Sequence, residues 1–338
     1  MKKIALITGI SGQDGAYLAK LLLTKNYTVI GADRRSARDD KWRLRKLGIE
    51  NKIIIEDFEL SEITQIIRIF NKYKISEVYN LAAQSFVGSS FVNPISTSDV
   101  TGLGVLRILE VIRNLKYKPK FYQASSSEMF GDVLESPQTM KTPFNPVSPY
   151  AISKLFAHYT TINYRRAYNL FAVSGICFNH ESPLRGEDFI TRKITTGLSK
   201  IKAGLLECLE VGNIDAKRDW GYAGDYVNAM WLMLQQKKAR DYIIATGKTY
   251  TVRQFINEAV KHFGFKTYWI GKKESEQLKL RSNNKTIIRI NKKFYRPNEV
   301  ETLLGDASET KKYLKWKPDV DFKNLVKMMS LSDLEIYN

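Results

Sequence analysis

Residues 4–15 read IALITGISGQDG, and this stretch decides the fold. The largely apolar run at its start is typical of a buried strand, and a GxxGxxG turn follows it directly. Glycines in such a turn let the backbone approach a pyrophosphate, which then meets the unpaired N–H groups of a helix N-terminus. The turn therefore predicts a dinucleotide site made by Gly9, Gly12, Gln13, Asp14 and Gly15.

Apolar runs and helical patterns continue to alternate as far as about residue 178. The short apolar runs lie at 28–32, 53–55, 78–81, 121–124 and 171–176. Near-continuous apolar strands separated by helices are typical of a parallel sheet that is covered on both faces. Right-handed crossovers between such strands give a doubly wound, Rossmann-like α/β fold, which is the fold class we predict.

The alternation of apolar runs and helical patterns ends after about residue 180, where segments rich in Arg, Lys, Asp and Gly separate short helices and strands. We expect this part to form a smaller, mostly C-terminal α/β lobe that binds substrate. The expected division places residues 1–178 in the dinucleotide-binding domain, with residues 225–247 returning to it. Residues 179–224 and 248–338 then form the substrate-binding lobe.

The composition excludes several classes of protein. Of the 338 residues, 43% are hydrophobic and 26% charged, which is ordinary for a globular protein. No apolar stretch reaches the length of a membrane span and the start does not resemble a signal peptide, so we expect a cytoplasmic protein without a membrane partner. The net charge of +18 comes from scattered lysines without interleaved aromatics, so no nucleic-acid partner is expected. Cys177 and Cys208 lack metal-ligand spacing, and no metal site is expected.

The end of the second apolar run indicates which dinucleotide binds. An acid at this point, here Asp33, usually accepts hydrogen bonds from an adenosine ribose, whereas arginine pairs with a 2′-phosphate in bidentate fashion. Because Arg34, Arg35 and Ser36 outweigh one acid, we predict NADP, and Asp33 keeps NAD open as the alternative. A second contact with the cofactor is expected where a later strand ends, at Leu81, Ala82 and Ala83.

The candidate catalytic residues follow in the middle of the chain. Tyr150 and Lys154 are four residues apart in a helical pattern, so they share a face, and an ammonium near a phenol favours the phenolate. Ser126 follows the apolar run at 121–124, at the sheet edge where α/β folds bind their ligands. Glu128 adds a carboxylate that simple hydride transfer does not need. We therefore expect oxidation followed by elimination, because a carboxylate can take a proton from carbon.

Nearly the whole chain resembles the GDP-mannose 4,6-dehydratase family of extended short-chain dehydrogenase/reductases. The resemblance rests on long sequence blocks, which are far more specific than the glycines of the turn. These blocks are residues 8–15, 179–183 (NHESP) with Arg185-Gly186, 191–194 (TRKI), Gly212-Asn213, 218–220 (RDW) and 296–300 (RPNEV).

The resemblance implies an enzyme that dehydrates a GDP-linked sugar and keeps its NADP through each turnover. Tyr150 would take the proton of the sugar 4-OH while hydride leaves C4, and the resulting ketone would acidify the proton on C5. Glu128 would abstract that proton, and Glu128 or Ser126 would help the 6-OH leave as water. Return of the hydride to C6 would then give a GDP-4-keto-6-deoxy sugar.

The resemblance also implies how the substrate is held. Tyr150 and Lys154 would contact the cofactor as well, and the chain would form a homodimer or homotetramer. Arginine suits a pyrophosphate because its planar fork binds two oxygens at once. The implied substrate-binding residues are Ser85, Asn179, Arg185, Arg192, Lys193, Arg218, Arg296 and Glu299.

Three departures from the family pattern keep alternatives open. Ser126 stands where the family usually has threonine, Phe86 where it usually has histidine, and Asp33 breaks the pattern before the arginine pair. Phe86 leaves GDP-manno-heptose beside GDP-mannose as a substrate. A related epimerase or 4-keto reductase of the same fold is the alternative activity. From another class, the alternative is a catalytically silent nucleotide-sensing or polyanion-binding protein.

Overall fold

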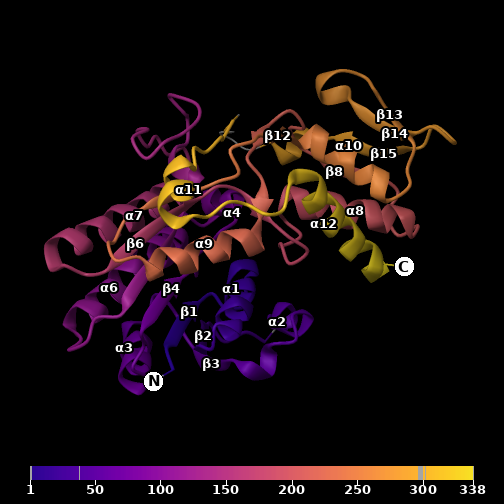
Figure 1. The fold of residues 1–338 in the computed structure, drawn as a ribbon. Helices are drawn as coiled ribbons and strands as arrows, with labels where there is room; N and C mark the ends of the chain where they lie inside the picture. The colour runs from indigo at the N-terminus through magenta and orange to yellow at the C-terminus, as the bar shows by residue number, and fades with distance from the viewer. Residues whose placement is uncertain (1, 38, 296–299, 301, 338) are drawn as a thin grey trace.

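The computed structural model describes residues 2–37, 39–295, 300 and 302–337. Its centre is a seven-stranded sheet in the order β11-β6-β5-β4-β1-β2-β3, in which all neighbouring strands are parallel (Figure 1). This confirms the predicted Rossmann-like α/β fold. The strand order reverses between β1 and β4, and such a switch point opens a ligand-binding crevice at the carboxyl ends of the strands. The strands are β1 (Ile4–Thr8), β2 (Thr28–Asp33), β3 (Ile54–Asp57), β4 (Glu77–Asn80), β5 (Lys120–Ser126), β6 (Ala172–Cys177) and β11 (Tyr242–Ile244).

Helices cover both faces of this sheet (Figure 1). Successive side chains of β1 point to opposite faces of the sheet and enter separate cores. Ile7 packs in the cluster that contains α1 and α9, and Leu6 packs in the cluster of α3 and α6. Both side chains are at most 1% exposed, and burial of each stabilises the fold by about 1.5–3 kcal/mol. The helices are α1 (Gln13–Thr24), α2 (Trp42–Lys46), α3 (Ile63–Lys72), α4 (Val87–Val92), α5 (Pro94–Ser98), α6 (Gly104–Asn114), α7 (Pro149–Tyr168), α9 (Ala223–Gln235) and α11 (Ser308–Leu314).

The second lobe is built around a four-stranded mixed sheet in the order β13-β14-β15-β8. Its core includes Leu198, Phe255 and Val326, which come from the three helices that pack together there. These helices are α8 (Ile190–Lys202), α10 (Val252–His262) and α12 (Phe322–Tyr337). The strands are β8 (Leu209–Val211), β13 (Thr267–Ile270), β14 (Gln277–Leu280) and β15 (Thr286–Ile290).

Short two-stranded sheets lie where the two parts meet. β7 (His180–Glu181) pairs with β10 (Gly221–Tyr222), and β9 (Lys217–Arg218) pairs with β12 (Tyr250–Thr251). Single helical turns lie at Glu50–Lys52, Asp99–Leu103, Ser127–Met129, Lys273–Ser275 and Lys292–Phe294. Within the described residues, no helix is both long and apolar enough to cross a membrane.

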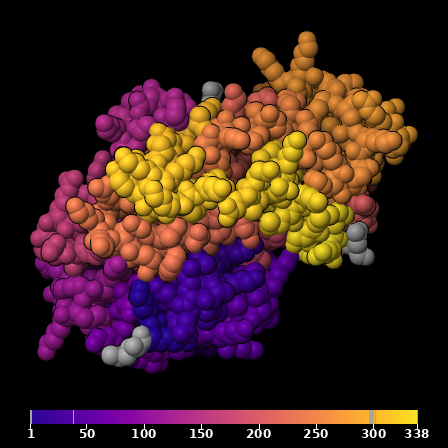
Figure 2. Space-filling model, viewed as in Figure 1, coloured from indigo at the N-terminus to yellow at the C-terminus, as the bar shows by residue number. Residues whose placement is uncertain are grey.

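The C-terminal part of the chain contacts both lobes. In Figure 2 it runs in yellow across the surface, from the region of the seven-stranded sheet to the second lobe. Thr310 of α11 donates a hydrogen bond to the carbonyl of Ile243 in β11, so this helix packs on the seven-stranded sheet. By contrast, α12 packs on α8 in the second lobe. The domain boundary at residue 178 stays a prediction.

Candidate active site

The turn after β1 is shaped so that only glycine fits at two positions. Gly9 has φ +68°, and a Cβ there would lie 3.0 Å from the backbone of Ala82. A Cβ on Gly15 would lie 2.4 Å from the Gly9 carbonyl oxygen. Thr8 holds the neighbouring strand end in place, because its hydroxyl accepts hydrogen bonds from the N–H groups of Leu81 and Ala82 at 3.1 Å. The result is a cradle of bare backbone at the start of α1, where Gly12 supplies no capping side chain.

The segment after β2 lines a small hollow beside this turn, with Arg34, Arg35 and Ser36 in its wall. Asp33 also lines it, but its carboxylate is used to hold the glycine-rich turn. One oxygen accepts from the Ser11 N–H at 3.0 Å and from the Ser11 hydroxyl, and the other accepts from the Arg34 N–H at 3.0 Å. The acid therefore stabilises the turn itself.

The structure brings the four predicted catalytic residues into one hollow at the carboxyl ends of the strands. Ser126 ends β5, and the helical turn that follows carries Glu128, whose N–H donates to the Ser126 hydroxyl at 3.2 Å. Tyr150 and Lys154 come from the first turns of α7. Both side chains are less than a tenth exposed, as is that of Glu128. Leu81, Ala83 and Ser85, also predicted from the sequence, line the same hollow.

Burial dominates the electrostatics of this hollow. It raises the pKa of Tyr150 well above the usual value; the hydrogen bond with the Ser126 side chain opposes the rise, and the charge of Glu128 adds to it. Burial lowers the pKa of Lys154 to about 8. The Lys154 ammonium nitrogen lies 2.8 Å from the Ala124 carbonyl oxygen and 5.8 Å from the centroid of the Tyr150 ring. The net shift of the Tyr150 pKa is therefore upward and not downward as expected from Lys154, because desolvation is the largest contribution.

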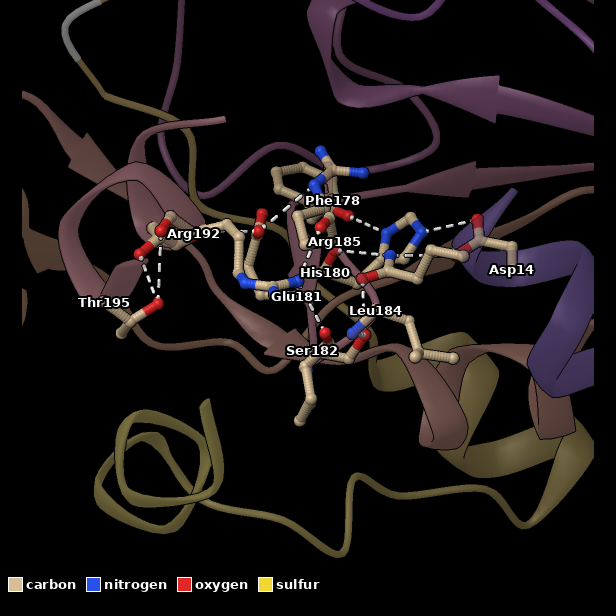
Figure 3. A network of polar contacts seen from close by, with 12 residues as sticks. Asp14, Phe178, His180, Glu181, Ser182, Leu184, Arg185, Arg192 and Thr195 are labelled. Carbon is tan, nitrogen blue, oxygen red and sulfur yellow. Dashed lines mark hydrogen bonds and ion pairs between the residues drawn. The ribbon is translucent and has the colours of Figure 1, made fainter. Parts of the chain in front are cut away.

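In the same crevice Asp14, predicted as a cofactor residue, is paired with His180, for which the sequence predicted no role (Figure 3). His180 of β7 places its Nε2 2.7 Å from an oxygen of Asp14 and its Nδ1 2.8 Å from the carbonyl oxygen of Phe178. Burial alone would lower the pKa of His180, but the charge of Asp14 and its hydrogen bond raise it. Likewise, burial would raise the pKa of Asp14, and His180 makes the net change a decrease. The only signal in the sequence was the presence of His180 in the NHESP block.

Gln13 makes a parallel link between the same two segments. Its amide nitrogen lies 3.1 Å from the carbonyl oxygen of His180, and its amide oxygen accepts from the Ser182 hydroxyl at 2.7 Å. Arg43 of α2, also missed, donates to the carbonyls of Leu184 at 2.7 Å and Ser11 at 3.0 Å. Side chains from α1 and α2 therefore fix the segment at 180–184 against the glycine-rich turn.

A larger hollow of about 380 Å³ lies between the sheet edge and the second lobe. Of the implied substrate-binding residues, Asn179, Lys193 and Arg218 line it. Asn179 also lines the catalytic hollow, as does Arg185, so the two hollows share a wall. Arg296 and Glu299 lie outside the described residues.

Arg192 is placed differently from its neighbours in the sequence. Its side chain is 3% exposed, and its Nη2 lies 2.7 Å from the Asp333 carboxylate of α12. Its Nη1 donates to the carbonyls of Pro183 at 2.6 Å and Arg185 at 3.0 Å (Figure 3). In this structure Arg192 supports the loop that carries Arg185 and does not line the large hollow. A substrate contact by Arg192 stays a prediction.

Aromatic rings line the larger hollow near the catalytic one. Phe86, 37% exposed, meets the ring of Phe189 edge to face with centroids 5.8 Å apart. The Arg185 guanidinium lies 3.5 Å from the centroid of the Phe189 ring and forms an ion pair with Glu181 at 3.1 Å. Phe189 was not singled out from the sequence, because a single aromatic residue in a loop carries no recognisable pattern.

Sequence comparisons with known proteins match almost the whole chain. The family model described as GDP-mannose 4,6 dehydratase matches residues 6–329. The GDP-mannose 4,6 dehydratase of Homo sapiens is 47% identical, covering 99% of this chain and 92% of its own. The GDP-mannose 4,6-dehydratase of Vibrio cholerae serotype O1 is also 47% identical, with 99% and 94% covered.

Solved structures share the fold at much lower identity. The dTDP-glucose 4,6-dehydratase of Streptomyces venezuelae, solved with NAD and TYD bound, has a TM-score of 0.83 at 18% identity, covering 98% of this chain and 97% of its own. RMD of Pseudomonas aeruginosa, complexed with NADPH, has a TM-score of 0.77 at 20% identity, with 99% and 100% covered. At this level the likeness shows the fold alone.

Proposed function

The chain belongs to the GDP-mannose 4,6-dehydratase family, and from this premise we propose that it dehydrates a GDP-linked sugar to a GDP-4-keto-6-deoxy sugar. The observation that carries the proposal is the meeting of Ser126, Glu128, Tyr150 and Lys154 in one hollow. Tyrosine, lysine and serine are sufficient to move the proton of an alcohol during oxidation. A carboxylate in the same hollow supports the further step of elimination.

The residues around the glycine-rich turn fit a nicotinamide dinucleotide. A Cβ at Gly9 or Gly15 would clash with the backbone of the turn and of the neighbouring strand end, and the uncapped start of α1 offers N–H groups to a pyrophosphate. A nicotinamide held there would supply the acceptor for hydride from C4 of the sugar and the donor of that hydride to C6, so the reaction would have no net redox change. Lys154 and Tyr150 border this site from α7.

The side chains then have distinct roles on the substrate. Tyr150 accepts the proton of the 4-OH, for which it must be in its phenolate form, and the hydrogen bond with the Ser126 side chain favours that form. The ketone at C4 makes the proton on C5 acidic, and Glu128 removes it. The same proton on Glu128 leaves with the 6-OH as water, which restores the carboxylate. C5 then takes a proton from solvent as hydride returns to C6, and Tyr150 releases the proton of the 4-OH, so both side chains end the turnover as they began it. Burial favours both transfers, because water does not compete for the protons.

We propose NADP as the cofactor. Arg34, Arg35 and Ser36 line the hollow beside the turn, where a 2′-phosphate is best matched by guanidinium groups. The Asp33 carboxylate already accepts hydrogen bonds from Ser11, which leaves it less able to bind a ribose hydroxyl. Calorimetry with NADP and with NAD tests this choice: tighter binding of NADP supports it, and tighter binding of NAD contradicts it.

GDP-mannose is the proposed substrate, with GDP-manno-heptose as the competitor. The larger hollow offers Lys193, Arg218 and Asn179 to a nucleoside diphosphate. Phe86 and Phe189 form an apolar wall beside the shared edge of the two hollows, where a sugar ring would pack through its C–H groups.

A homodimer or homotetramer is proposed as the working assembly. Ile152, Phe156 and Tyr159 of α7 are each 44–56% exposed and share an apolar hollow with Leu106 of α6. A contiguous apolar face of this kind marks a protein interface more often than a solvated surface.

A cytoplasmic location stays a prediction.

The experiment is incubation of the NADP-loaded protein with GDP-mannose in deuterated water. A GDP-4-keto-6-deoxy product with deuterium at C5 supports the proposal, because the solvent exchanges at the carbon that Glu128 deprotonates. Intact substrate without exchange, for GDP-mannose and for the heptose, contradicts it. Consumption of added NADPH in proportion to product would instead identify a 4-keto reductase.

A further inference from the structure

The hydrogen-bond partners of His180 determine its charge. Nε2 faces a carboxylate oxygen of Asp14 at 2.7 Å, and Nδ1 faces the carbonyl oxygen of Phe178 at 2.8 Å. Neither partner can donate a hydrogen bond when Asp14 is ionised, so each contact needs an N–H on the ring. A neutral imidazole carries only one N–H, and the imidazolium carries two. The geometry therefore calls for the charged ring.

The surroundings of the pair contain charges of both signs. Arg185 disfavours the imidazolium by like charge, while Tyr226 of α9 stacks on the ring with centroids 4.7 Å apart. Besides His180, the cations that interact with the charge of Asp14 include Arg185, Arg43 and Lys154. The 2.7 Å contact with the half-buried Asp14 carboxylate outweighs the like charge of Arg185, because the net shift of the His180 pKa is upward.

The pair joins the two parts of the site. Asp14 lies in the first turn of α1, within the cradle that fits the cofactor, and His180 lies on β7 between Asn179 and Glu181. Asn179 lines both hollows, and Glu181 forms an ion pair with Arg185. A displacement of His180 would therefore move the residues that face the substrate.

We propose that His180, as an imidazolium paired with Asp14, is a positioning residue that fixes Asn179 and Arg185 relative to the cofactor cradle. The proposal rests on the proposed function only for the identity of the ligand that these residues hold. Loss of the proton removes one of the two hydrogen bonds and the charge, and the hold on the GDP portion of the substrate weakens.

The direction of the pH dependence follows from the raised pKa of His180. Its stabilising contribution is fully present below the pKa of histidine in the unfolded chain, about 6.5, and is lost as pH rises through the folded-state value. Binding of GDP should accordingly weaken on the alkaline side. Titration of Asp14 does not produce this loss, because its pKa is lowered.

The direct test is the protonation state of the three histidines of the chain, measured by NMR on the full-length protein with labelled imidazole carbons. Burial lowers the pKa of both His158 and His262, so they serve as internal references that are neutral at about pH 7.5. We expect His180 to give the signal of an imidazolium at that pH, and to lose it in Asp14→Asn. A neutral His180 in the wild-type protein, or an unchanged signal in Asp14→Asn, would overturn the proposal.

The functional arm measures GDP binding by calorimetry across pH, which needs no turnover. Asp14→Asn is expected to weaken GDP binding about tenfold near neutral pH and to remove the alkaline decrease. His180→Gln, which keeps one donor but no charge, should bind weakly at every pH. His262→Asn in the second lobe is the matched control and should behave as wild type. Unchanged GDP affinity in both site variants, with melting temperatures retained, would contradict a positioning role. If GDP-mannose is not turned over, these results still stand.

Discussion

Two clusters of ionisable groups lie in one crevice, one buried and one half-buried, and they differ in whether burial or a close opposite charge sets their pKa values. In the first, on α7, burial lowers the pKa of Lys154 to about 8 and raises that of Tyr150. In the second, between α1 and β7, Asp14 and His180 face each other, and each holds the other in its charged form. In the first cluster only Lys154 has its pKa moved toward neutral pH, while that of Tyr150 moves away from it, and the second cluster is fixed as an ion pair.

This contrast separates residues that change their protonation during the reaction from residues that hold the crevice in shape. A group that is buried without a close opposite charge is ready to change its protonation, as a catalytic acid or base must. A paired group resists that change and holds the backbone around it. The pairing continues from Glu181–Arg185 to Arg192–Asp333, which ties the loop beside the active site to α12 (Figure 3).

The largest effect is expected from removing the hydroxyl in the first cluster. Tyr150→Phe should lower kcat by about 10²–10⁴-fold, because the 4-OH loses its proton acceptor. The fold and NADP binding should persist, since the ring still fills its site. Steady-state kinetics and calorimetry measure the two quantities. A variant that has lost its fold, or one that retains near-normal kcat, would show that Tyr150 belongs with the supporting residues.

A loss of stability is expected when a buried ion pair such as Arg192–Asp333 is broken. Asp333→Asn leaves the Arg192 guanidinium buried without its counter-charge and should lower the free energy of unfolding by about 3–5 kcal/mol. Denaturant unfolding measures the change. The exposed pair Arg45–Asp39 offers the control, because Asp39→Asn should leave the unfolding midpoint unchanged. Equal results for the two variants would remove the distinction between buried and exposed pairs.

The smallest effect concerns pH. In the cofactor-free protein, Lys154 should lose its proton as pH rises through about 8, and NADP affinity should fall with it because the ammonium no longer donates. Lys154→Met should bind NADP more weakly and without this inflection. Calorimetry from about pH 6.5 to 9.5 spans the transition. An inflection that persists in Lys154→Met would assign it to another group.

The local parts of this site were predictable, and the long-range pairs were not. The strand–turn–helix at residues 4–15 and the i, i+4 pair Tyr150–Lys154 each depend on residues that are close together in the sequence. The structure places them as expected. His180 is 166 residues from Asp14, so no local pattern links them. Arg192 was assigned to the substrate because a sequence shows that an arginine is present but not which anion it faces. Its partner, Asp333, is 141 residues away.

The central claim is that Glu128 turns an oxidation site into an elimination site. The measurement is the reaction of the NADP-loaded Glu128→Gln variant with GDP-mannose in deuterated water, followed by NMR of the sugar and by the absorbance of reduced nicotinamide. We predict that C4 is still oxidised, while deuterium at C5 and the 6-deoxy product are both reduced by at least about 10²-fold. Near-normal dehydration by Glu128→Gln would show that Glu128 does not carry the elimination.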